Sequence, residues 1–132
     1  SMVGVSGAGR VLIGTVQGDV HDIGKDIVVF MLDVNGFEVH DLGVDVSPQT
    51  FVDQITRFGP DVVGLSGFLT VAFDSMKETV EAIERAGLRD RVKIMIGGGM
   101  VDEHIWHYTR ADAYGQDAMA AVSLAQDWTR KE

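Results

Sequence analysis

Near its start the chain reads Val11-Leu-Ile-Gly-Thr-Val-Gln-Gly-Asp-Val-His-Asp-Ile-Gly24. The first six of these residues are mostly apolar and β-branched, which predicts a buried strand followed by a polar, glycine-containing loop. Apolar residues then recur at helical spacing, and Asn35-Gly36 predicts the end of that helix. The recurring residues are Ile23, Ile27, Phe30, Met31 and Val34. A strand, a loop and a helix in this order form the first part of a βαβ unit.

The rest of the chain repeats the same alternation of strands and helices. Ser47-Pro48 predicts a helix start, because serine caps helices and proline is tolerated at the first helical position. We expect further strands at 37–41, 61–65, 92–96 and 111–113, and helices at 48–58, 73–86, 102–108 and 117–129. This pattern predicts an α/β, flavodoxin-like, doubly wound sheet of five parallel strands in the order 2-1-3-4-5. We expect residues 1–10 to be a linker or a tag remnant, and residues 11–132 to form one Rossmann-like domain.

Composition excludes several classes of protein. The chain has 132 residues, no cysteine and a net charge of −9. Without cysteine there is no disulfide, thiolate zinc site or iron–sulfur cluster. The negative charge disfavours nucleic-acid binding, and the apolar runs are too short for a membrane span. We therefore expect a cytoplasmic protein.

In such sheets ligands bind beyond the carboxyl ends of the strands, so four loops are candidates: 17–24, 66–70, 97–99 and 113–115. In the first loop, His21 can ligate a metal while its other ring nitrogen bonds a carboxylate such as Asp19. One histidine does not make a closed zinc site, so any metal here takes most of its ligands from elsewhere, for example from a macrocycle.

Simpler structural interpretations stand beside this one. Asp19 and Asp22 can cap the first helix, Thr70 or Asp74 can cap the third, and the three glycines at 97–99 can form a turn. The acidic first loop disfavours a flavin phosphate. A nucleotide phosphate site is disfavoured because the chain has neither a Walker lysine nor GxGxxG.

Three motifs in register resemble the cobalamin (vitamin B12)-binding Rossmann domain over about residues 10–130. Asp19-Val-His-Asp-Ile-Gly24 matches the DxHxxG motif of that family, Ser66-Gly-Phe68 lies where it has SxL, and Gly97-Gly98 matches its GG. The wider strings Gly14–Lys25 and Asp41–Val44 are similar to the methyl-transfer branch. That branch includes methionine synthase and the corrinoid proteins of methanol, methylamine and methoxy-aromatic demethylation.

The resemblance implies cobalamin bound base-off, with its nucleotide tail in a slot beside the sheet. It implies that His21 is the lower axial ligand of cobalt and that Asp19 bonds the other imidazole nitrogen. Gly24 lets the tail pass, Ser66 bonds the buried base, and Thr70 lies below the corrin rim. The other residues expected to contact the cofactor are Val20, Asp22, Ile23, Phe68, Leu69, Gly97, Gly98, Gly99 and Tyr114.

The sequence departs from the family pattern at two positions. Phe68 replaces the usual leucine and is expected to narrow or reshape the slot. Ala72 stands where methionine synthase has a serine that extends the His–Asp pair, so weaker proton control of the histidine is expected. His40, His104 and His107 are expected to be structural or exposed.

The resemblance implies a corrinoid carrier protein of a methyltransferase system, such as an O-demethylase. Cobalt would accept a methyl group from a substrate on one methyltransferase and pass it to a second, whose acceptor is expected to be tetrahydrofolate. We expect a cofactor-carrying component without a catalytic residue independent of cobalt, and a reductive activator as a further partner. The alternatives are the cobalamin subunit of an adenosylcobalamin-dependent mutase, a B12-sensing or light-sensing regulatory domain, and a flavodoxin-like domain with no cofactor.

Overall fold

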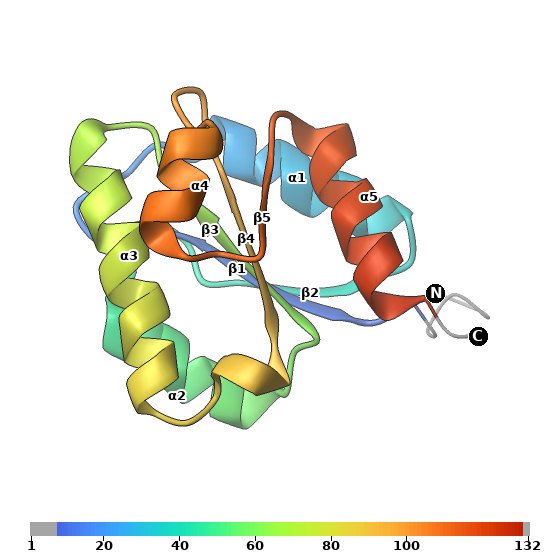
Figure 1. Cartoon of the computed structure of the whole chain (residues 1–132). Coiled ribbons are helices and arrows are strands. Elements are labelled where there is room, and N and C mark those ends of the chain that lie inside the picture. The colour runs from blue at the N-terminus through green and yellow to red at the C-terminus, as the bar shows by residue number, and fades with distance from the viewer. Residues whose placement is uncertain (1–7, 131–132) are drawn as a thin grey trace.

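Five parallel strands form a sheet in the order β2-β1-β3-β4-β5, which confirms the predicted topology (Figure 1). The structure is a computed structural model that describes residues 8–130, so most of the expected linker or tag remnant at 1–10 lies outside the described residues. The strands are β1 (Arg10–Thr15), β2 (Glu38–Asp41), β3 (Val62–Ser66), β4 (Lys93–Gly97) and β5 (Ala113–Gly115).

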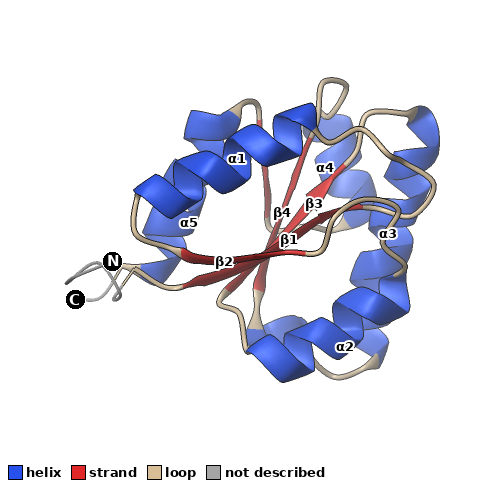
Figure 2. Ribbon diagram, turned by 180° about the vertical axis from the view of Figure 1, so that it is seen from behind, coloured by secondary structure: helices blue, strands red, loops and turns tan. Residues whose placement is uncertain are grey.

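Helices connect successive strands and cover both faces of the sheet. They are α1 (Ile23–Val34), α2 (Pro48–Phe58), α3 (Thr70–Arg85), the short 3-10 helix η2 (Arg89–Arg91), α4 (Glu103–Thr109) and α5 (Ala118–Thr129). In Figure 2, α1 and α5 lie on one side of the sheet and α2 and α3 on the other. None of the helices within residues 8–130 is long and apolar enough to cross a membrane.

Most predicted boundaries are confirmed to within a residue or so, and α2 shows why. The hydroxyl oxygen of Ser47 accepts a hydrogen bond from the backbone N–H of Thr50, and Pro48 occupies the first turn. The helix ends at Gly59, whose φ of 65° is left-handed. Here every signal is local.

Two predicted boundaries are wrong, and for the first of them a long-range contact is the reason. The predicted helix 73–86 begins already at Thr70, because the backbone N–H groups of Phe68 and Leu69 bond the carboxylate of Asp19. The predicted strand 111–113 pairs only from Ala113 onward.

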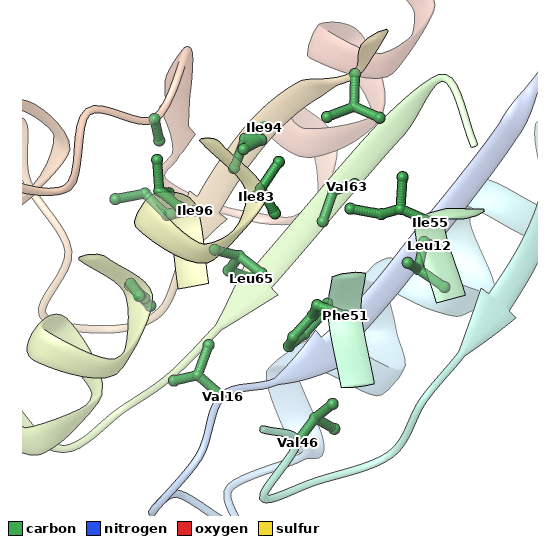
Figure 3. Close-up of a cluster of buried hydrophobic side chains, with 14 of the residues drawn as sticks. Leu12, Val16, Val46, Phe51, Ile55, Val63, Leu65, Ile83, Ile94 and Ile96 are labelled. Carbon is green, nitrogen blue, oxygen red and sulfur yellow. The ribbon is translucent and has the colours of Figure 1, made fainter. Parts of the chain in front are cut away.

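The two faces of the sheet differ in how completely they are filled. The larger cluster of buried side chains lies under α2, α3 and α4, and we call this side the closed face. Its core includes Met76. It also includes Phe51, Leu65, Ile83 and Ile96, which are labelled in Figure 3. The smaller cluster lies under α1 and α5 and includes Val11, Leu32, Val62, Met95 and Ala125. We call this side the slot face, because a narrow cavity runs along it between α1 and α5.

Helix α1 carries apolar residues on two sides. Leu32 is fully buried, and Val28 and Met31 pack against the slot-face cluster. Most of the apolar residues that identify α1 in the sequence instead face solvent: Ile23, Ile27, Phe30 and Val34.

The strand register brings the candidate loops together. Thr15 pairs with Ser66, Ser66 with Gly97, and Gly97 with Gly115, so the ends of four strands form one row. The loops that follow these residues therefore emerge side by side at the carboxyl edge of the sheet.

Candidate cofactor site

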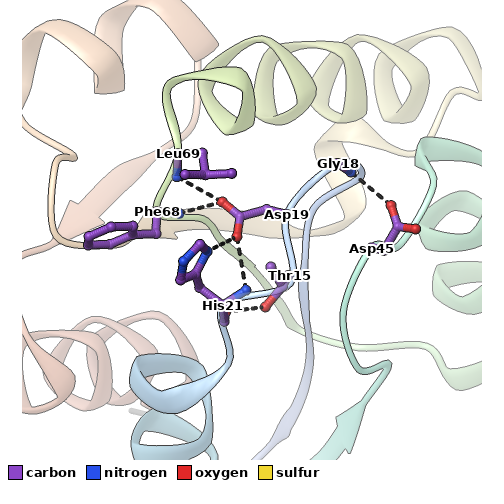
Figure 4. A network of polar contacts seen from close by, with 7 residues as sticks. All are labelled: Thr15, Gly18, Asp19, His21, Asp45, Phe68 and Leu69. Atoms are coloured by element: carbon purple, nitrogen blue, oxygen red, sulfur yellow. Dashed lines mark hydrogen bonds and ion pairs between the residues drawn. The ribbon is translucent and has the colours of Figure 1, made fainter.

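Asp19 is the centre of a hydrogen-bond network at this edge (Figure 4). Its side chain is fully buried. Oδ1 accepts from the Nδ1 of His21 at 2.7 Å and from the backbone N–H of His21 at 2.9 Å. Oδ2 accepts from the backbone N–H groups of Phe68 and Leu69 at 2.7 and 2.9 Å. One carboxylate thus ties the loop after β1 to the loop after β3.

These contacts keep Asp19 ionised. Burial alone would raise the pKa of this carboxyl. The backbone N–H groups of Leu69, His21 and Phe68, together with the His21 ring, outweigh burial and hold the pKa of Asp19 far below its usual range. Two amide N–H groups therefore occupy Oδ2 of Asp19.

The ionised carboxylate fixes the chemistry of His21. Because Asp19 can only accept, Nδ1 of His21 donates, and in the neutral imidazole the lone pair is therefore on Nε2. The side chain is 49% exposed, so this lone pair is accessible from the loop edge. The imidazole ring lies against the Phe68 ring, with 4.8 Å between centroids and 38° between planes.

The backbone of the loop is anchored from several elements. The Thr15 hydroxyl donates to the carbonyl oxygen of His21 at 3.1 Å, and the Ser75 hydroxyl in α3 donates to that of Gln17 at 2.7 Å. The backbone N–H of Gly18 donates to the Asp45 carboxylate at 2.8 Å. His21 is therefore held in place before any ligand binds.

An apolar rim lies on the segments that follow the strands at this edge, where the Phe68 ring contacts His21. The rim residues are large, apolar and mostly solvent-exposed: Val20, Phe68, Leu69, Val71 and Met100. Exposed apolar groups that gather at one place mark a binding surface. A flat, largely apolar ligand above His21 would cover them.

A slot of about 200 Å³ runs from this edge along the slot face between α1 and α5. Of the residues expected to contact a cofactor, it is lined by Gly24, Ser66 and Gly97–Gly99. Its volume is below the roughly 300–1,000 Å³ of a complete small-molecule site, which suits one part of a larger ligand.

Two glycines in the slot region are required by close backbone approach. Gly98 has φ +146°, and a Cβ there would lie 1.8 Å from the carbonyl oxygen of Gly67. A Cβ on Gly67 would lie 2.4 Å from the Cβ of Ala72. By contrast, a Cβ on Gly24 meets nothing within 4 Å and would enter open space.

Several expected residues take places that the sequence did not reveal. Phe68 does not line the slot, and its ring packs against His21 instead. Tyr114 also lies off the slot: it packs against the closed-face core, 5.8 Å from the Trp106 ring. Asp22 occupies the N-cap position of α1, but its side chain makes no capping hydrogen bond.

The capping interpretations of Thr70 and Asp74 are wrong, because Leu69 is the N-cap of α3 and makes no side-chain bond. The histidines at positions 40, 104 and 107 are exposed, as expected.

The sequence did not point to two parts of the slot. The first is the wall formed by the start of α5, with Gln116, Asp117, Ala118 and Ala121. The small size of Ala118 and Ala121 was the only signal. The second is Lys25, buried beside the slot with Nζ 2.9 Å from Asp41 and from Asp26.

At this site the protein offers a metal ion a single ligand, the imidazole of His21. Within residues 8–130, no group of three or more His, Asp or Glu side chains could hold a metal ion. These features fit a cofactor that brings its own metal ligands. They are the half-exposed His21 with its ring held by Asp19, the apolar rim and the glycine-lined slot. The fold and the site together define a domain that holds a large metal-containing cofactor.

Comparison with known proteins agrees with this class. The profile of the family described as "B12 binding domain" matches residues 9–123. The chain belongs to this family, and cobalamin is its cofactor. It is 41% identical over 119 residues to dimethylamine corrinoid protein 3 of Methanosarcina mazei, covering 90% of this chain and 71% of that protein.

Two solved structures are similar to the domain. A cobalamin-binding protein from Desulfitobacterium hafniense superposes with a TM-score of 0.89 at 44% identity, over 90% of this chain and 58% of that chain. The methanol:cobalamin methyltransferase complex of Methanosarcina barkeri superposes with a TM-score of 0.88 at 28% identity, over 95% of this chain and 48% of that chain. The chain spans little more than half the length of most curated relatives it matches.

Proposed function

We propose that the chain is the cofactor-holding domain of a corrinoid protein that carries methyl groups between methyltransferases. One observation carries the proposal: the buried Asp19 holds the ring of the half-exposed His21 in the loop that leads to Gly24, where the slot lining begins on α1. When bound, the cobalt of the corrinoid supplies the atom that receives and releases the methyl group.

Each part of the site has a task in this proposal. His21 would ligate cobalt through Nε2, and Asp19 holds the ring in place and makes Nε2 a stronger donor by accepting the hydrogen bond from Nδ1. The apolar rim, including Val20 and Leu69, would contact the corrin ring and exclude water from that contact. The slot would take the nucleotide tail, with Gly24 leaving its entrance open and Ser66 as a hydrogen-bond partner for the base.

The methyl donor is proposed to be a small methylated amine or methanol. The relatives described above carry dimethylamine and methanol in their names, which favours these donors over the methoxy-aromatic substrate of an O-demethylase. The same names favour methyl transfer over a mutase or a regulatory domain. The partners are proposed to be a substrate:corrinoid methyltransferase and a second methyltransferase with tetrahydrofolate as acceptor, with a reductive activator in the cytoplasm.

The cofactor site is tested by mixing the chain with hydroxocobalamin, removing free cofactor by gel filtration and recording the visible spectrum. The wild-type chain should keep the cofactor with a histidine-ligated, base-off spectrum. His21→Ala should lose the bands of histidine ligation and keep less cofactor, because the imidazole ligand is gone. It should still keep some cofactor, because the slot still binds the tail.

The matched control is His40→Ala, which removes an exposed imidazole on β2. It should leave the spectrum unchanged. An unchanged spectrum in His21→Ala would contradict the ligand assignment, and wild-type chain that elutes without cobalamin would contradict the site.

A further inference from the structure

The outer side of α1 presents a stripe of large apolar side chains to solvent. Ile23, Ile27, Phe30 and Val34 are 78, 51, 64 and 60% exposed. They lie on one side of the helix, because residues three and four apart share a face. We call these four residues the α1 stripe. It begins next to the cofactor site and continues for about 16 Å along the helix, at 1.5 Å per residue.

Neither the fold nor the slot accounts for the α1 stripe. The buried side of α1, with Leu32 and Val28, already packs on the sheet. The slot is lined on α1 by Gly24, Lys25 and Val28, none of which belongs to the stripe. Contiguous exposed apolar side chains of this size mark an interaction surface.

The spacing of the stripe indicates what shape covers it. Its members are separated by four, three and four residues, which is the alternation of the two core positions in a coiled-coil heptad. A helix that packs with this spacing lies nearly parallel to α1 and inserts its own apolar residues between those of the stripe. The surface is therefore shaped for another amphipathic helix.

The charges beside the stripe indicate which kind of helix fits. Asp26 and Asp33 directly precede Ile27 and Val34, so both occupy the same flank of the stripe, and both are exposed. On the opposite flank lie Gly24 and Met31, which are uncharged.

Lys25 balances only part of this acidic flank, because its Nζ pairs with Asp26 but is shared with Asp41, and Asp33 has no ion pair among residues 8–130. Lys25 is the single basic residue of α1, and it is buried with its Nζ bonded to Asp41 and Asp26. Two α1 helices packed antiparallel would bring the acidic flanks of both copies together, which opposes self-association.

We propose that the α1 stripe is a docking site for an amphipathic helix of another polypeptide. The apolar residues of that helix pack on Ile27, Phe30 and Val34, and its lysine or arginine residues pair with Asp26 and Asp33. The proposal does not depend on cobalamin binding, because only Ile23 lies next to the cofactor site.

The test uses a fluorescein-labelled synthetic peptide of about three heptads, with leucine at the core positions and lysine at the flanks. A second peptide carries glutamate at the flanks. Binding to the chain is measured by fluorescence anisotropy. The lysine peptide should bind saturably and more weakly as salt rises, and the glutamate peptide should bind at least about tenfold more weakly.

Variants of exposed residues then locate the site. Phe30→Glu should weaken the lysine peptide by about tenfold or more, since it removes a large apolar contact. Asp33→Lys should weaken the lysine peptide and strengthen the glutamate peptide. Thr56→Glu, which adds the same charge on α2 at the closed face, should change neither affinity.

Three results would overturn the proposal. The first is no saturable binding of the lysine peptide. The second is binding that Phe30→Glu leaves intact. The third is a chain that sediments as a dimer and becomes monomeric with Phe30→Glu, because the stripe would then be covered by a second copy.

Discussion

The two faces of the sheet differ in packing: one is filled by large buried side chains, and the other contains an open slot. On the closed face, large side chains such as Phe51, Met76 and Ile83 are fully buried and fill the space under three helices. On the slot face, Gly24, Ala118 and Ala121 line a channel that stays open. The closed face supplies stability, and the slot face gives up packing in order to hold a ligand.

This contrast shows where a domain of this size can hold a ligand slot without losing its packed core. A slot removes dispersion contacts and buried apolar area, which costs stability. The chain confines that cost to the side between α1 and α5. At the carboxyl edge, hydrogen bonds to the buried Asp19 hold the loops in place of apolar packing.

The largest expected loss of stability comes from truncating a buried side chain on the closed face, compared with truncating one on the slot face. Phe51→Ala should lower the free energy of unfolding by about 3–5 kcal/mol, because it leaves a cavity among fully buried residues. Val28→Ala, at the half-buried slot lining, should cost only about 1 kcal/mol. Urea unfolding measures both. Equal losses would remove the distinction between the faces.

Asp19→Asn should lower the free energy of unfolding by about 3 kcal/mol, because it removes a buried charge that accepts four hydrogen bonds. Since folding lowers the pKa of Asp19, its charge stabilises the fold fully above the ordinary value of 3.8, and this contribution is lost as the pH falls below that value.

The gap between wild type and Asp19→Asn should therefore be wide near pH 7 and narrower near pH 3 in urea unfolding. Asp22→Asn is the matched control, since the Asp22 side chain caps nothing, and it should stay within about 0.5 kcal/mol of wild type. A gap independent of pH would contradict the role of the ionised carboxylate.

Gly98→Ala should destabilise the chain by about 1–3 kcal/mol, because its Cβ meets the Gly67 carbonyl and its φ is unfavourable for alanine. It should also reshape the slot and weaken cobalamin binding, which an absorbance titration measures. Wild-type stability in this variant would show that the loop relaxes at no cost.

Gly24→Ala should change stability and affinity in opposite directions. A Cβ here meets no neighbour, and alanine favours the helix, so the free energy of unfolding should rise by about 0.5–1 kcal/mol. Cobalamin should nevertheless bind more weakly, because the methyl group enters the slot. A variant that is more stable and binds cobalamin as well as wild type would refute this slot entrance.

The smallest effect is expected at Phe68. Its ring is half exposed and packs on His21, so Phe68→Leu should leave the unfolding free energy within about 0.5 kcal/mol and weaken cobalamin binding only a few-fold. Affinity from the same absorbance titration measures the change. A large gain in affinity would support the initial expectation that Phe68 obstructs the slot.

Local signals in the sequence were sufficient for most of the fold. Strand runs such as Val92–Ile96, the cap at Ser47 and the stop at Gly59 act through neighbours in the chain, and the topology followed from their alternation. The start of α3 was missed because Asp19 binds Phe68 and Leu69 across about fifty residues.

The site was predictable in part for the same reason. The proximity of Asp19 and His21 follows from their spacing, and the structure brings their side chains to 2.7 Å. The side to which Tyr114 points, the wall at Ala118 and the outward stripe of α1 depend on tertiary packing, which no local pattern encodes.

The most direct test of the central claim is electron paramagnetic resonance of the chain loaded with cob(II)alamin, with the protein uniformly labelled with ¹⁵N. If His21 is the lower ligand, the cobalt lines should split into doublets from one protein ¹⁵N nucleus, and His21→Ala should abolish that splitting. Triplets from the unlabelled ¹⁴N of the cofactor's own base would contradict the claim.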